Sequence, residues 1–127
     1  MTRKDLINEY KNLVFRAGVF QIRNTANGKI FVEGSVNLDK IWNRHLSQLR
    51  FGGHPSQELQ QDWKVFGEPQ FVFEILGELA PGEQTEAEIK REVKLLEQMY
   101  LEELQPYGDK GYNRKPKETI STASSGS

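Results

Sequence analysis

Residues 18–32 read GVFQIRNTANGKIFV and have the pattern of a β-hairpin. Two runs rich in β-branched and aromatic residues, 18–23 and 30–32, are joined by a segment that contains Asn27-Gly28. An Asn-Gly pair between two such runs is a strong local signal for a hairpin, because both residues tolerate a positive φ. We therefore expect two antiparallel strands here.

Downstream of the hairpin, three segments have apolar residues at helical spacing. Each segment is preceded by a residue suited to cap a helix, and the third has a Glu three residues after its cap, as in a capping box. Gly52-Gly53 is expected to end the first helix, and Gly67 with Pro69 the second. The expected caps are Asn37, Ser56 and Thr85 (with Glu88), and the apolar positions are Leu38, Trp42, Leu46 and Leu49, then Leu59, Trp63 and Phe66, then Ile89, Val93, Leu96, Tyr100 and Leu104.

A third strand is expected over residues 70–76, QFVFEIL, and residues 111–113 are expected to return to the sheet edge. Three strands with helices between them indicate a small α+β domain whose central three-stranded sheet is antiparallel or mixed and is flanked by helices. This domain is expected to span residues 17–114. An N-terminal helix is expected within residues 1–16, from about Lys4 to Phe15, and a disordered polar tail over residues 115–127.

Composition excludes several classes of protein. The 127 residues suffice for one ordinary domain. The chain has no cysteine, which excludes disulfides, thiolate zinc sites and a cysteine nucleophile. No membrane-spanning stretch is expected, and we predict a cytoplasmic protein. The net charge of −1 combines a basic first half with an acidic region after residue 67, so a nucleic acid would have to meet the first half or the tail.

Several short sequence motifs occur in the same order, and at nearly the same spacing, as the motifs of one known family. Gly18-Val19-Phe20 and Phe31-Val32-Glu33 lie on the two hairpin strands, and NLDKIWNRHLSQLRFGGHPSQELQQDWKVFG follows over residues 37–67. FVFEIL, Leu-Glu-x-x-Tyr at residues 96–100 and Gly-Tyr-Asn at 111–113 complete the order. Over residues 18–113 the chain resembles the GIY-YIG nuclease superfamily. The motifs in its predicted helices resemble those of the phage homing endonucleases. The chain as a whole resembles a divergent bacterial group associated with LuxR-type regulators.

The resemblance implies a nuclease site with several substitutions. In the family, a motif tyrosine activates water, an arginine stabilises charge on the phosphate, and a glutamate holds a divalent metal. The implied tyrosine positions carry Phe20 and Phe31, which have no hydroxyl, and the implied arginine position carries Ile41. Glu33 falls at the motif glycine, as an insertion or as a replacement. The implied positions that are retained are His45, His54 and Asn113 for catalysis and Glu97 for the metal.

The retained residues also have simpler interpretations. His45 could be a core histidine bonded to backbone, His54 a helix-entry residue, and Asn113 a cap. Glu97 could lie on a solvated flank. Glu33 would repel a phosphodiester, or would supply a second carboxylate to a metal with Glu97. The candidate nucleic-acid contacts, which could equally form solvated surface, are Arg23, Lys40, Arg44 and Arg50.

Three functions fit these residues. The first is a nucleic-acid-binding or regulatory domain with a degenerate active site and weak or no cleavage. The second is an active endonuclease that needs Mg²⁺ or another divalent cation, in which His45 or a metal-bound water replaces the tyrosine and Lys40 or Arg44 replaces the arginine. The third is a protein-interaction scaffold with an acidic face formed by Glu83, Glu86, Glu88, Glu92, Glu102 and Glu103. DNA or another nucleic acid is the expected partner of the first two, and a protein that of the third.

Overall fold

The computed structural model describes residues 16–80 and 82–115. The predicted N-terminal helix and the predicted tail beyond residue 115 lie outside these residues, so both stay predictions.

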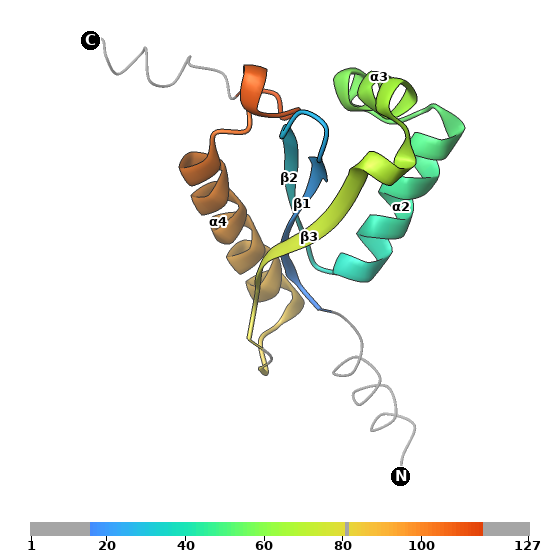
Figure 1. Ribbon diagram of the computed structural model, residues 1–127. Coiled ribbons are helices and arrows are strands. Elements are labelled where there is room, and N and C mark those ends of the chain that lie inside the picture. Colours follow the sequence, from blue (N-terminus) through green and yellow to red (C-terminus); the bar gives the residue numbers. More distant parts are fainter. Residues whose placement is uncertain (1–15, 81, 116–127) are drawn as a thin grey trace, which may run out of the picture.

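The centre of the domain is a three-stranded sheet, antiparallel throughout, in the order β2-β1-β3 (Figure 1). Its strands are β1 (Gly18–Asn24), β2 (Ile30–Ser35) and β3 (Phe71–Glu78). The hairpin between β1 and β2 is confirmed, and Gly28 has a φ of 82° in its turn. A residue with a side chain would be strained there, which is why glycine suits the position.

The three predicted helices are confirmed as α2 (Leu38–Phe51), α3 (Gln57–Phe66) and α4 (Glu86–Leu104). Each predicted cap accepts a hydrogen bond from the first turn of its helix, and both bonds of the capping box at α4 are present. Short 3-10 turns lie at Glu68–Gln70 and Gly108–Lys110. Figure 1 shows α2 and α3 on one side of the sheet and α4 on the other.

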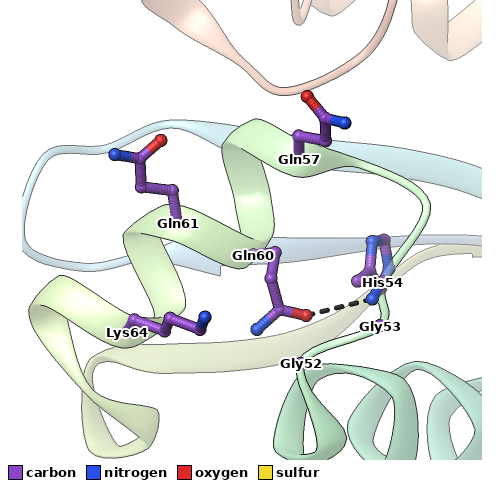
Figure 2. A pocket seen from close by; sticks show the side chains of 7 residues that line it. All are labelled: Gly52, Gly53, His54, Gln57, Gln60, Gln61 and Lys64. Carbon is purple, nitrogen blue, oxygen red and sulfur yellow. Dashed lines mark hydrogen bonds between the residues drawn. The ribbon is translucent and has the colours of Figure 1, made fainter.

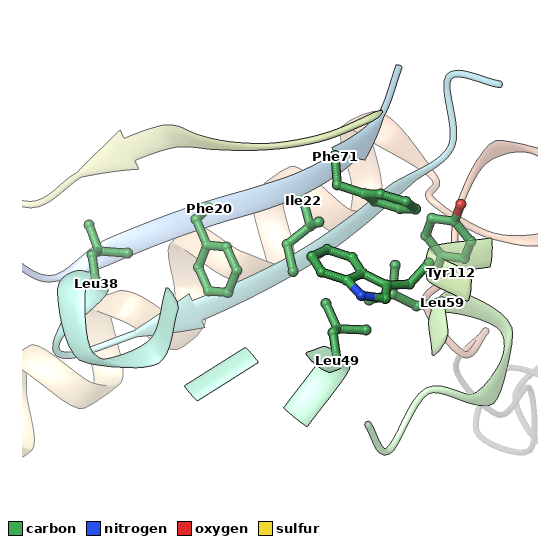
Figure 3. Packing of buried hydrophobic residues seen from close by; sticks show 8 residues of the cluster. Phe20, Ile22, Leu38, Leu49, Leu59, Phe71 and Tyr112 are labelled. Atoms are coloured by element: carbon green, nitrogen blue, oxygen red, sulfur yellow. The ribbon is translucent and has the colours of Figure 1, made fainter. Parts of the chain in front are cut away.

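The core lies between the sheet and the α2–α3 pair. The strand register places Phe20 opposite Glu33 and Ile22 opposite Phe31, so these four side chains share one face of the sheet. Figure 3 shows the buried cluster on that face, which consists of Phe20, Ile22, Leu38, Leu49, Leu59, Trp63, Phe71 and Tyr112.

The opposite face of the sheet packs against α4. Gly34 of β2 allows this close approach, because an added Cβ would lie 2.8 Å from Val93 Cγ1 and 3.3 Å from Glu97 Cβ. The lack of a side chain at residue 34 therefore lets Glu97 reach the β2 backbone.

The chain after α4 returns to the outer side of β2, as predicted. Gly111 forms a parallel bridge with Ile30, and the Tyr112 N–H donates to the Ile30 carbonyl at 2.8 Å. The Tyr112 hydroxyl donates to Asp62 at 2.7 Å and accepts from Asn24 at 3.1 Å. This anchored return positions Asn113 beside β2.

Candidate active site

Three polar side chains from separate elements meet on the α2 side of the sheet. His45 Nε2 lies 2.5 Å from Oε1 of Glu33 on β2, and His45 Nδ1 lies 2.7 Å from Nε2 of His54. His54 follows α2, and its Nδ1 accepts the Ser56 backbone N–H at 2.9 Å. Both histidines are buried, whereas the Glu33 side chain is 35% exposed.

The hydrogen-bond partners assign the tautomers of both histidines. The Ser56 amide can only donate, so His54 Nδ1 carries no proton and His54 Nε2 carries the N–H. That N–H donates to His45 Nδ1, which leaves the His45 proton on Nε2, directed at Glu33. The network therefore runs in one direction, from Ser56 to Glu33.

This arrangement refines the alternatives for His45. The residue is buried, as the core alternative expects, but its partners are two side chains rather than backbone. Its Nε2 is protonated and its Nδ1 lone pair is occupied, so neither nitrogen can accept a proton from a substrate. The replacement of the missing tyrosine by His45 is therefore disfavoured.

Glu33 occupies an ordinary strand position. Residues 18–23 of β1 pair with residues 30–35 of β2 without a register shift. An inserted residue would leave a bulge in this pairing, so the register favours replacement of the motif glycine over an insertion. A metal shared by Glu33 and Glu97 gains no support, because Glu33 points to the α2 face of the sheet and Glu97 meets β2 from the α4 face.

Apolar packing accounts for Phe20, Phe31 and Ile41. Phe20 has no exposed surface, and its ring centroid lies 5.6 Å from that of His45 and 5.0 Å from that of Phe73. Phe31 is partly buried and contacts the same histidine. Ile41 packs against the core cluster. These three side chains supply neither a hydroxyl nor a cation.

Glu97 faces the hairpin rather than water. Its Oε2 accepts the Gly34 N–H at 2.9 Å, and its Oε1 lies 3.8 Å from Lys94 Nζ. Mg²⁺ in proteins is commonly held by one or two carboxylates, with waters and substrate phosphates completing its shell. Glu97 Oε1 fits one such ligand, so the described residues fit the ion as a single protein ligand and not as a closed cage.

Asn113 acts on the backbone of β2. Its Oδ1 accepts the Val32 N–H and its Nδ2 donates to the Val32 carbonyl, both at 2.8 Å. The side chain thus takes the place of a neighbouring strand, and its polar atoms are engaged in holding β2.

The four predicted nucleic-acid contacts divide into two pairs. Arg23 forms two bonds of 2.9 Å to Glu74, and Arg50 forms two bonds to Glu68. Hydrogen bonds from Arg23 and then Gln21 lower the pKa of Glu74 to about 2. The other two cations, Lys40 and Arg44, are exposed on α2 and form no ion pair with the described residues.

Gln60 contributes to the site and was missed by the sequence reasoning. Figure 2 shows it beside His54, whose backbone N–H it accepts at Oε1, while its Nε2 donates to the Leu49 carbonyl. Both bonds are 3.0 Å long. The available signal was a polar residue three positions before Trp63 on the buried side of α3.

His54 should make the stability of the domain depend on pH. Burial, and then the neighbouring His45, lower its pKa from the ordinary 6.5 to about 4. His54 becomes protonated below about pH 6.5 in the unfolded chain, but only below about pH 4 in the folded chain. The contribution of His54 to the free energy of unfolding is therefore complete above pH 6.5. It falls as the pH falls, by about 2 kcal/mol at pH 5.

Urea unfolding at pH 7 and pH 5 would measure this effect. The His54→Gln variant should lose less stability than the wild type between these two values. Glu68 and Glu74 have lowered pKa values and titrate below this window, so they should not mask the difference. Equal losses in both proteins would contradict the assignment of the effect to His54.

None of the helices described in this structure combines the length and apolar character of a membrane span.

No family model matches the sequence. Intron-associated endonuclease 1 of Enterobacteria phage T4 is 37% identical over 52 residues, which are 41% of this chain and 21% of that protein. The chain thus spans about a fifth of that relative.

Two solved structures match much more of the chain. One is the catalytic domain of the homing endonuclease I-TevI, with 31% identity, a TM-score of 0.64, and coverage of 79% of this chain and 99% of that one. The other is a glutamate-to-alanine variant of the same catalytic domain, with the same identity and TM-score, and coverage of 78% and 93%. With this fold and identity over nearly a whole catalytic domain, the chain belongs to the GIY-YIG family and is a homing endonuclease-like domain of that family.

Proposed function

We propose that the protein is a nucleic-acid-binding GIY-YIG domain that cleaves phosphodiesters weakly or not at all. The observation that carries this proposal is the packing at the positions implied for water activation and charge stabilisation. Phe20 has no exposed surface, and Ile41 is partly buried against the core, so neither position offers a substrate a hydroxyl or a cation. Loss of one preorganised group of this kind typically slows an enzyme by about 10²–10³-fold.

The exposed side of α2 is the proposed binding surface. Lys40 and Arg44 are four residues apart, which places them on the same side of the helix. In the described residues they have no carboxylate partner, in contrast to Arg23 and Arg50, so their charges are available to phosphate groups. DNA is the proposed ligand because the relatives of known structure are catalytic domains of an intron endonuclease.

Removing both charges should weaken DNA binding. We expect the Lys40→Ala/Arg44→Ala variant to bind duplex DNA about 10–100-fold more weakly at low salt, with a smaller slope of log affinity against log salt, by about 2. Electrophoretic shifts over a salt series would measure both quantities.

The matched control is Lys90→Ala/Arg91→Ala, which removes the same two charges from exposed positions on α4. This control should bind as the wild type does. If the wild type shifts no duplex, single-stranded or branched DNA and no RNA at low salt, the proposal is wrong.

A second candidate function is slow, divalent-cation-dependent cleavage of DNA. The observation that favours it is Glu97, whose Oε2 is fixed by Gly34 while its Oε1 accepts no hydrogen bond within the described residues. A bound cation would stabilise negative charge on the phosphate oxygens. Plasmid nicking that needs both a divalent cation and the Glu97 carboxylate would support this candidate.

A further inference from the structure

The network that starts at Ser56 fixes which group can take a proton. A backbone amide does not release its proton at ordinary pH, so the network orients its members and cannot conduct a proton through them. Each histidine uses its one N–H as a donor and its one lone pair as an acceptor. Glu33 Oε1 is engaged by His45, and Glu33 Oε2 has no hydrogen-bond partner within residues 16–80 and 82–115. Oε2 is thus the one unoccupied acceptor of this cluster.

The position of Glu33 matches the place where a proton acceptor is missing. Glu33 lies directly opposite Phe20 in the antiparallel pair, and such neighbours have Cβ atoms about 4.5–5.5 Å apart on the same face. Residue 34, which follows it on β2, donates its N–H to Glu97. Because side chains alternate along a strand, Glu33 points to the α2 face of the sheet, whereas Glu97 meets the neighbouring residue of β2 from the α4 face.

Burial and exposure separate the roles within the cluster. The His45 side chain is 7% exposed and the Glu33 side chain 35%, so the carboxylate is the member that solvent and a ligand can reach. Phe20 and Phe31 contact the imidazole of His45 and hold its plane. A carboxylate with one fixed oxygen and one accessible oxygen has the geometry of a general base.

We propose that Glu33 is the general base for phosphodiester hydrolysis in this domain, and that His45 and His54 are positioning residues. The proposal rests on the second candidate function. In the step, a water gives one proton to Glu33 Oε2 while its oxygen forms a bond to phosphorus. The bond between phosphorus and the leaving sugar oxygen breaks, and that oxygen keeps the electron pair and takes a proton from solvent. The products are a phosphomonoester and a free hydroxyl group.

The decisive variant is Glu33→Gln, which keeps the shape and an acceptor for the His45 N–H but cannot take a proton. We expect it to nick supercoiled plasmid about 100-fold more slowly than the wild type in Mg²⁺ or Mn²⁺. Its rate should also lose the rise with pH that a base imposes. Its DNA affinity should stay equal or increase, because one negative charge near the phosphate is removed.

Three further proteins complete the experiment. Glu103→Gln, at an exposed position on α4, is the matched control and should cleave at the wild-type rate. Glu97→Ala sets the background for contaminating nuclease. Glu33→Ala should show the same loss as Glu33→Gln, and it replaces that variant if the latter does not fold.

Two results would overturn the proposal. One is cleavage by Glu33→Gln at the wild-type rate with the same pH profile. The other is a wild type that cleaves supercoiled, branched and single-stranded DNA no faster than Glu97→Ala does. Shift assays on the same preparations separate this failure from a failure of nucleic-acid binding, because binding can persist in a protein that does not cleave.

Discussion

Replacing Phe20 with alanine is expected to lower the free energy of unfolding by about 3–5 kcal/mol. The ring has no exposed surface and lies between His45 and Phe73, so its removal leaves a cavity in the main core cluster. Urea unfolding monitored by tryptophan fluorescence would give the difference directly.

The matched control is Phe51→Ala. Phe51 ends α2 and is 89% exposed, so this change should stay within about 0.5 kcal/mol of the wild type. Equal losses for the two variants would contradict a packed position for Phe20. The explanation that Phe20 replaces the family tyrosine because its ring is packed in the core would then fail as well.

Replacing Asn113 with alanine is expected to lower the free energy of unfolding by about 2–4 kcal/mol. The change removes both side-chain hydrogen bonds to Val32, a residue that is 2% exposed, and leaves one backbone donor and one acceptor unpaired. A buried group that loses its partner typically costs about 1–3 kcal/mol. Hydrogen exchange should show faster exchange of the Val32 amide.

Asn43→Ala supplies the comparison for this variant, because Asn43 is exposed on α2. It should leave both the unfolding midpoint and the Val32 exchange rate nearly unchanged. If Asn113→Ala behaves like Asn43→Ala, the Asn113 side chain does not hold β2 in solution.

The sequence predicted the elements whose signals are local. Asn37 and Ser56 were recognised as caps because a cap bonds an amide two or three residues away, and the Asn-Gly turn is equally local. The order of the family's sequence motifs along the chain also sufficed to identify the family. The choice between an antiparallel and a mixed sheet needed the structure, because it depends on how β3 meets β1.

The site was predicted less completely, because its contacts join distant residues. Glu33 and His45 are twelve positions apart, and Asn113 and Val32 are 81 apart. The spacing of apolar residues along the chain carries no information about the partner of Glu33. It therefore could not show that a histidine binds this carboxylate, which was expected to repel phosphate. The pairing of Arg23 with Glu74 across 51 positions was equally hidden, and it makes this cation a weaker candidate for DNA contact than Lys40 or Arg44.

The hydrogen bonds along β2 also bear on self-association. A border strand with unpaired backbone groups is a template on which a second chain can add a strand. Here the carbonyl of Ile30, both backbone groups of Val32 and the amide of Gly34 are already bonded to the returning chain or to α4. Sheet-to-sheet aggregation or strand exchange through this border would first have to break those bonds. Tyr112, Asn113 and Glu97 therefore protect β2 against amyloid-like growth.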